Sequence, residues 1–161
     1  MATCLLRPRL LPVLQLSDGG LYKTPRFRTP QYVGDPINAM RIFNDKEVDE
    51  IILLDITATI QKRAPDMERV ANIVSESFMP LAYGGGIATL EQAMQLFDTG
   101  VEKLVLGSAA FFNPELVSAI AARAGSQSVV VSIDVSEGWL KDTQVVVKSA
   151  THATKQSPVT Y

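Results

Sequence analysis

Two turns of small residues are the first candidates for a chemical role. Gly84, Gly85 and Gly86 end the apolar run 80–85, and Gly107 and Ser108 end the run 103–108. Each turn leads into a predicted helix, and such loops leave backbone N–H groups uncovered, so phosphate oxygens can approach closely. A lone glycine triplet could equally be a tight turn, but a second small-residue turn one unit later strengthens the interpretation. The pair predicts a phosphate site at the ends of two adjacent parallel strands.

Carboxylates occur at the ends of two other apolar runs. Asp55 lies in the run 51–56, and Asp134 lies in the run 128–135. Burying a carboxylate at the end of an apolar strand is costly without a purpose, so the two could face each other as general acid and base. The alternative is that each Asp caps the loop or helix after its strand. Three further polar residues lie at or after the end of the first apolar run: Gln15, Asp18 and Lys23.

Charged residues recur at the opposite ends of the predicted strands. Arg9 precedes the first strand, Glu50 the second, and Glu102 and Lys103 stand at the start of the fourth. Since parallel strands begin at one edge, these residues would form a mixed-charge ring on the floor of a barrel. One interpretation is a set of ordinary surface ion pairs, each worth little. The other is a plug or gate at the bottom of a central passage.

The elements that position these residues alternate between strands and helices. Continuous apolar runs predict five strands, at 10–16, 51–56, 80–85, 103–108 and 128–135. Capping residues predict helices that begin at Pro36, at Pro65 and at Pro114. A further helix is predicted to run from Leu90 to a stop at Gly100. Segment 19–36 is predicted to be a long polar loop. Runs that are continuously apolar, and not alternating, favour a parallel sheet buried on both faces.

The predicted fold class is α/β, an incomplete (βα)8 barrel of the TIM type. An open doubly wound sheet is the main alternative, but polar loops after all five strands favour a barrel with its functional groups on one rim. A closed barrel typically needs ~250 residues and eight units, whereas residues 1–161 supply four units and a fifth strand. Residues 136–161 are predicted to be an irregular, β-hairpin-like tail. The chain is therefore the N-terminal part of one barrel domain, or it pairs with a second copy, because an open sheet exposes an apolar edge.

Composition narrows the class of protein. With 47% hydrophobic and 20% charged residues, the chain can build a core and is not disordered. A net charge of −2 gives no reason to expect nucleic acid or an anionic membrane as a partner. The start resembles a cleaved signal only superficially, because Arg7, Pro8 and Arg9 interrupt its apolar run. The single Cys4 fits a reducing cytosol, and we expect a cytoplasmic protein without a metal ion or organic cofactor.

Seven motifs, running in order from about Arg9 to Asp134, identify a resemblance. They are DGGLYK, GDPINAM, VDEIILLDITATI, YGGGI, GVEKLVLGSAA, NPEL and GSQSVVVSID. Together they resemble the HisF-type cyclase subunit of imidazole glycerol phosphate synthase. The resemblance implies a (βα)8 barrel that takes ammonia from a glutamine amidotransferase partner. It also implies conversion of a bis-phosphorylated ribulosyl nucleotide into imidazole glycerol phosphate and an aminoimidazole carboxamide ribotide, a step of histidine biosynthesis.

The resemblance also implies roles for individual residues. Asp134 matches the catalytic aspartate of the fifth strand, Lys23 the substrate-binding lysine of the first loop, and Asp55 the acidic residue after the second strand. The two small-residue turns match one of two phosphate sites, although the family usually has Asn-Thr where Gly107 and Ser108 stand. On the floor, three of the four charged residues of the family's ammonia gate are matched by Arg9, Glu50 and Lys103, with Glu102 beside them on the surface expected to dock the partner.

Departures from the family pattern open two alternatives. The family's first catalytic aspartate falls on Gln15, and an amide cannot exchange a proton as a carboxylate does. Pro12 and the segments 23–38 and 41–50 look more like a paralogous branch, which serves amide or acetamidino modification of surface-polysaccharide sugars. There the barrel would receive ammonia but act on a sugar nucleotide. The other alternative is an inactive interaction module that keeps the docking floor and lacks a complete active site.

Overall fold

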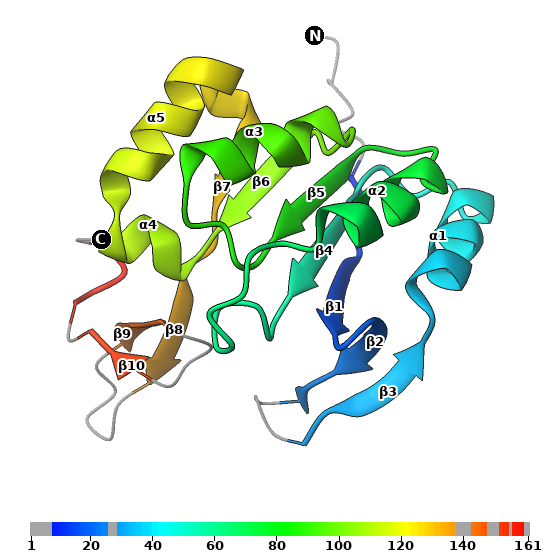
Figure 1. Ribbon diagram of the computed structural model, residues 1–161. Helices are drawn as coiled ribbons and strands as arrows, with labels where there is room; N and C mark the ends of the chain where they lie inside the picture. Colours follow the sequence, from blue (N-terminus) through cyan, green and yellow to red (C-terminus); the bar gives the residue numbers. More distant parts are fainter. Residues whose placement is uncertain (1–7, 26–28, 138–142, 148–151, 155, 160–161) are drawn as a thin grey trace, which may run out of the picture.

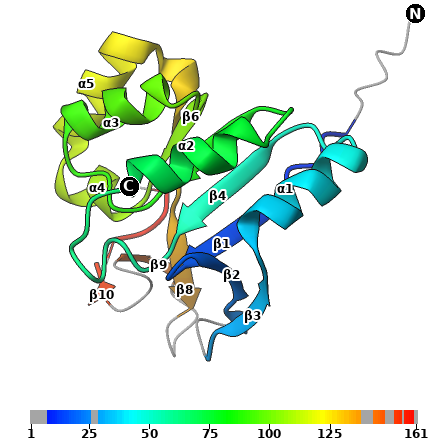
Figure 2. The same cartoon turned by 45° about the vertical axis from the view of Figure 1, so that its right-hand side comes forward.

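The computed structural model (Figure 1) describes residues 8–25, 29–137, 143–147, 152–154 and 156–159. Its main sheet has seven strands in the order β3-β2-β1-β4-β5-β6-β7. These strands are β1 (Val13–Ser17), β2 (Gly20–Lys23), β3 (Gln31–Gly34), β4 (Ile51–Asp55), β5 (Leu81–Gly84), β6 (Lys103–Leu106) and β7 (Val129–Val131). The strands β1, β4, β5, β6 and β7 pair in parallel. The predicted parallel α/β arrangement is confirmed, and the sheet is curved but not closed (Figure 2).

Helices cover one face of this sheet. They are α1 (Pro36–Asp45), α2 (Met67–Ser75), α3 (Leu90–Asp98), α4 (Ser108–Phe112) and α5 (Pro114–Ala124), and a 3₁₀ turn covers Ser126–Ser128. Consecutive long helices pack side by side along the outside of the sheet (Figures 1 and 2). Their starts are fixed locally: Asp35 accepts a hydrogen bond from the Asn38 N–H at 3.0 Å, and Thr89 forms a capping box with Gln92. These caps set where each loop at the end of a strand stops.

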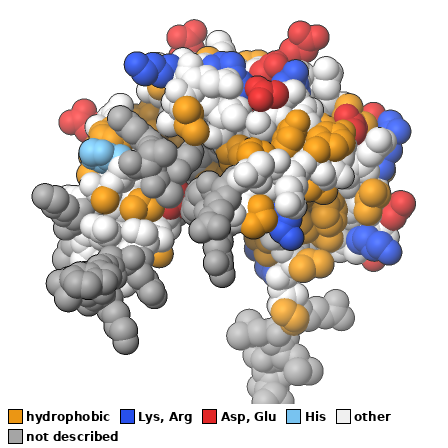
Figure 3. Space-filling model, turned by 90° about the horizontal axis from the view of Figure 1, so that it is seen from below, with side chains coloured by type: hydrophobic (Ala, Val, Ile, Leu, Met, Phe, Trp, Pro, Cys, Tyr) orange, Lys and Arg blue, Asp and Glu red, His pale blue; other side chains and the backbone are white. Residues whose placement is uncertain are grey.

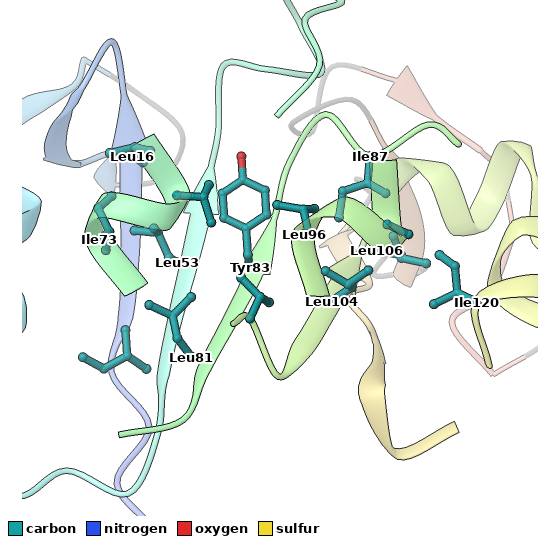
Figure 4. Packing of buried hydrophobic residues seen from close by; sticks show 14 of the residues in the cluster. Leu16, Leu53, Ile73, Leu81, Tyr83, Ile87, Leu96, Leu104, Leu106 and Ile120 are labelled. Atoms are coloured by element: carbon teal, nitrogen blue, oxygen red, sulfur yellow. The ribbon is translucent and has the colours of Figure 1, made fainter. Parts of the chain in front are cut away.

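The hydrophobic core lies between the sheet and the helices. Figure 4 shows Tyr83 on β5 flanked by leucines of the neighbouring strands and of α3. Leu53, Tyr83, Leu96 and Leu104 are all fully buried. Burying side chains of this size contributes about 1.5–3 kcal/mol each, so the parallel strands form the rigid frame on which the loops are mounted.

Two predictions about the strands are corrected. Segment 19–36 is not a long loop, because β2 pairs antiparallel with β1, and β3 pairs antiparallel with β2. The rings of Tyr22 and Tyr32 stack edge to face across this hairpin with centroids 5.5 Å apart. The predicted fifth strand also ends early, at Val131. Asp134 already belongs to β8, because the chain turns away from β6 after the Ser132 N–H bonds to the Leu106 carbonyl at 2.9 Å.

A second, small sheet follows the main one. It consists of β8 (Asp134–Glu137), β9 (Thr143–Val147) and β10 (His152–Ala153), all antiparallel, in the order β10-β9-β8. In Figure 1 it lies below the C-terminal ends of β6 and β7, on the side of the loops that follow the parallel strands. Val145, Val146 and Val147 are buried. The small sheet and the hairpin β2–β3 therefore stand at the same end of the molecule.

Candidate functional site

The two faces of the main sheet differ in what covers them. The strand register places Gln15, Leu54, Gly84 and Val105 in one row across β1, β4, β5 and β6. Because side chains alternate between the faces of a strand, this row lies opposite Tyr83 and the helices. We call the helix-free side the inner face. Seen from the end at which the parallel strands finish, hydrophobic side chains are visible in the middle of the molecule (Figure 3).

The two small-residue turns lie together at the C-terminal end of the sheet, which we call the rim. They are Gly84–Gly86, which begins with the last residue of β5, and Gly107 before α4, and both line one cavity of about 130 Å³. Gly85 has φ of 118°, and a Cβ there would collide with the backbone carbonyl oxygen of Asp55. Only glycine combines that backbone conformation with such close packing. The structure therefore brings the two turns side by side, as a shared anion site requires.

Asp134 lines the same cavity as the two turns. It is the first residue of β8, and its carboxyl group is half-buried. Burial raises the pKa of the Asp134 carboxyl above its usual range, because the charged form loses solvation. A carboxyl shifted in this direction exchanges protons more readily near neutral pH than an ordinary surface aspartate. The rim cavity is thus lined by the two small-residue turns and by one carboxyl group whose pKa is raised.

The Asp55 carboxylate accepts hydrogen bonds from the loop that follows β4. Its Oδ1 accepts from the backbone N–H groups of Thr57 and Ala58 at 3.1 and 2.9 Å, and from the Thr57 hydroxyl at 3.0 Å. Its Oδ2 accepts from Arg63 Nη2 at 2.9 Å, and the side chain is 4% exposed. This pattern matches the capping alternative, in which the carboxylate holds the loop after β4. Burial, and next the charge of Asp55, raise the pKa of the Tyr83 hydroxyl beyond its usual range.

Gln15 is held by the end of the β2 strand. Its Oε1 accepts from the Thr24 N–H at 3.2 Å and from the Thr24 hydroxyl at 2.6 Å. Lys23, which lies in β2 and not in a loop, lines the same hollow as Gln15. Asp18 is exposed in the turn between β1 and β2, with a left-handed φ of 46°. Gln15 and Lys23 therefore adjoin each other, whereas Asp18 stands at the tip of the hairpin turn.

At the opposite end of the sheet, which we call the floor, the predicted charges form an ion cluster. Glu50 is 3% exposed and accepts from two cations: Arg9 Nη2 at 3.0 Å and Lys103 Nζ at 2.6 Å. Lys103 lies on β6 in register with Ala82 of β5, so its side chain leaves the sheet on the inner face. Glu102 is exposed at the same end. The three central charges meet as predicted, with the carboxylate neutralised from both sides.

Two residues of these sites were missed from the sequence. Thr24 and Arg63 each bind a predicted site residue, Gln15 and Asp55 respectively. Thr24 follows Lys23 directly, so an ST-type turn was the available signal. Arg63 is eight residues after Asp55 within an irregular loop, and no local sequence pattern predicts their contact. Among the described residues, no group of three His, Cys, Asp or Glu side chains could hold a metal ion.

Five parallel strands with intervening helices, and small-residue turns on one rim, define part of a β/α barrel. The family model for "Histidine biosynthesis protein" matches residues 9–161. A Pseudomonas aeruginosa protein named "Putative imidazole glycerol phosphate synthase subunit hisF2" is 49% identical over 155 residues, which is 96% of this chain and 62% of that protein. "Imidazole glycerol phosphate synthase subunit HisF" of Helicobacter hepaticus is 42% identical over 132 residues, 82% of this chain and 53% of that protein.

The chain belongs to this Histidine biosynthesis protein family, whose members are TIM barrels. A third relative, from Leptospira interrogans and named "Putative imidazole glycerol phosphate synthase subunit HisF", is 44% identical over 96% of this chain and 61% of its own length. The chain thus spans about three-fifths of the length of such relatives. Within the part of the chain that the structure describes, no helix is long and apolar enough to cross a membrane.

Proposed function

We propose that the chain forms the N-terminal part of an ammonia-using synthase subunit of the imidazole glycerol phosphate synthase type. The observation that carries this proposal is the meeting of Asp134 with the two small-residue turns around one cavity. Asp134 acts as the general acid or base, and the two small-residue turns bind one phosphate of the substrate. The Gly86 N–H then exchanges its hydrogen bond to the Thr59 hydroxyl, at 3.4 Å, for one to a phosphate oxygen. A cytoplasmic location of this subunit fits its single cysteine.

Positioning is the second part of the proposal. A phosphate held at the rim anchors a phosphorylated substrate so that its reacting atoms lie over Asp134, and such anchoring can contribute several kcal/mol of the barrier. Lys23, which lines the same hollow as Gln15, supplies a cation for another part of the substrate. A substrate with two phosphates needs a second seat, which we assign to the portion of the barrel that relatives carry beyond this chain's span.

The floor docks a glutamine amidotransferase, and the ion cluster of Arg9, Glu50 and Lys103 gates the entry of ammonia. In barrel enzymes chemistry lies at the strand C-terminal ends, so charge at the other end fits a partner surface. A pull-down with the cognate glutaminase tests this assignment. Arg9→Glu reverses a charge that is 57% exposed and should abolish capture, while Lys62→Glu, exposed in the loop after β4 at the opposite end of the sheet, should not. Equal capture by both variants would move the docking surface elsewhere.

Gln15 favours a second candidate function. An amide at the position of the family's first catalytic aspartate cannot share in acid–base cyclisation. Its Oε1 is also occupied by Thr24. This observation favours the paralogous branch, in which the same ammonia route serves amide or acetamidino modification of surface-polysaccharide sugars. If the amide at Gln15 abolishes catalysis altogether, the chain is an inactive interaction module that retains only the floor.

Activity assays separate these candidates. We expect negligible ammonia-dependent turnover of the histidine-pathway intermediate by the 161-residue chain, and no rescue by Gln15→Asp. The carboxylate pair and the second phosphate seat would both be needed for that reaction. The longest chain that the gene encodes should be assayed in parallel with ammonium salts as the nitrogen source. Robust turnover by the 161-residue chain or by Gln15→Asp would overturn both the need for the second seat and the preference for the paralogous branch.

A further inference from the structure

A second and larger cavity lies next to the rim cavity, toward the helices. Its volume is about 380 Å³, and it is bounded by four segments: the loop 58–64 after β4, the loop 86–88 after β5, α3 at Gln92, and α4 with the start of α5. We call it the helix-side cavity. It shares several lining residues with the Asp134 cavity, among them Gly86 and Ser108. The two hollows therefore lie on either side of the same small-residue turns.

The lining of the helix-side cavity combines apolar walls with positive charge. Ala58, Ile87 and Leu116 are buried and supply part of its apolar surface. The charged residues that line it are Lys62 and Arg63, and no carboxylate is among them. A hollow with this composition disfavours cations and suits an anion that carries an apolar body.

The two cations are in different situations. Arg63 already donates to Asp55 at 2.9 Å, and that carboxylate offsets its charge. Lys62 is exposed and, among the described residues, takes part in none of the ion pairs of the structure. An ammonium at the edge of an apolar hollow can form a charge-assisted hydrogen bond to an entering anion. Lys62 is thus the group that would select the charge of a ligand.

We propose that the helix-side cavity binds a small organic monoanion with an apolar, ring-sized body, whose anionic group pairs with Lys62. Its volume lies toward the lower end of the ~300–1,000 Å³ range of small-molecule sites, and its mostly apolar lining with a few polar groups is typical of them. This ligand is distinct from the phosphate and the ammonia of the proposed function. The site does not depend on Gln15, on Asp134 or on the portion of the barrel that relatives have in addition.

The fluorescent anion 8-anilinonaphthalene-1-sulfonate is a suitable probe, because it carries one sulfonate on an aromatic body. We expect saturable binding of one probe per chain. Lys62→Glu should weaken it about tenfold or more, as expected when a charged hydrogen-bond partner is replaced by a repelling one. Ala88→Trp, at an exposed lining position, should weaken binding at least as much by filling the hollow. Lys46→Glu makes the same charge change outside the cavity and should leave binding unchanged.

Two results would overturn the proposal. Probe bound to the open inner face, or to a partly unfolded chain, would be insensitive to both Lys62→Glu and Ala88→Trp. Displacement of the probe by inorganic phosphate, in a chain whose probe binding Lys62→Glu leaves unchanged, would place it in the Asp134 cavity. Circular dichroism of each variant separates loss of the site from loss of the fold. Failure of phosphate to bind at the rim would contradict the proposed function and leave this result intact.

Discussion

The two ends of the sheet handle charge in opposite ways. At the floor, Glu50 is buried between Arg9 and Lys103, and its charge is neutralised by side chains. At the rim, Asp134 is half-buried and, among the described residues, stands outside the ion pairs of the structure. A carboxylate held between two cations stabilises a framework, whereas a carboxyl group that lines a cavity and lies outside these ion pairs is available to a ligand. The contrast indicates where structure is held and where chemistry is possible.

The same contrast appears between two carboxylates of the rim. Asp55 and Asp134 both line the small cavity. The carboxylate oxygens of Asp55, however, already accept hydrogen bonds from Thr57, Ala58 and Arg63. Its place in the strand register explains this difference, because Asp55 alternates with Leu54 of the inner face and so points toward the helices. Position at the end of a strand is therefore not sufficient for a catalytic role.

The largest effect should come from Asp134. In the longest chain that the gene encodes, Asp134→Asn should lower ammonia-dependent turnover by about 10²–10⁴-fold, the usual contribution of general acid–base catalysis. Steady-state kinetics with ammonium salts measure it. Asp98→Asn, an exposed position at the end of α3, is the matched control and should be silent. If Asp134→Asn retained most of the turnover, the rim would no longer differ chemically from the floor.

Substitution in the ion cluster of the floor should lower the stability of the fold. Glu50→Gln leaves Lys103, which is 27% exposed, without its counter-charge. We expect a loss of about 2–3 kcal/mol in the free energy of unfolding, below the ~3–5 kcal/mol for a fully buried pair because both cations reach solvent. Urea unfolding measures the change. Glu102→Gln, exposed on the same end, should change stability by less than about 0.5 kcal/mol, and equal effects of the two variants would remove the special status of the ion cluster.

Substitutions of the two rim aspartates should differ in their effect on the free energy of unfolding. Asp55→Asn weakens the ion pair to Arg63 and the cap of the loop after β4, so we expect a loss of about 1–2 kcal/mol in unfolding free energy. Asp134→Asn should leave stability within about 0.5 kcal/mol of the parent chain. The measurement is again urea unfolding at pH 7. A larger loss for Asp134→Asn than for Asp55→Asn would reverse the roles given to the two side chains.

The smallest effect is a dependence on pH. Burial raises the pKa of Asp134 in the folded chain above its unfolded value of 3.8, so the folded state binds more protons in the window just above that value. The contribution of Asp134 to stability therefore falls as pH rises through this window. The parent chain should lose stability relative to Asp134→Asn between acidic and near-neutral pH. Unfolding curves of both at several pH values test this, and an opposite trend would mean that Asp134 gains a cationic partner on folding.

Local patterns in the sequence predicted the frame well. The runs 51–56, 80–85 and 103–108 became β4, β5 and β6 with boundaries shifted by at most two residues, because a buried parallel strand needs a continuous apolar run. The capping pair Asp35-Pro36 predicted where the first helix begins. The glycine turns could be predicted because glycine is the residue type that allows a positive φ and close backbone packing.

Long-range pairing was not predictable in the same way. The hairpin β2–β3 was predicted as a loop, because its residues are polar and its pairing with β1 depends on the Asp18-Gly19 turn and on the stacking of Tyr22 and Tyr32. The face on which Asp55 lies follows from strand register, and its contact with Arg63 follows from the path of an irregular loop. The sequence pattern therefore predicted the carboxylates but could not separate the structural one from the available one.

The central claim is that the two small-residue turns of the rim bind phosphate beside Asp134, and backbone amide chemical shifts measure it most directly. The ¹⁵N-labelled chain is titrated with inorganic phosphate at constant pH and ionic strength, with chloride as the matched control anion. We predict saturable shifts at the amides of Gly85, Gly86, Ser108 and Ala109, with the floor amides of Glu50 and Lys103 unmoved. Shifts that are absent from the turns, or that centre on another part of the chain, would contradict the account.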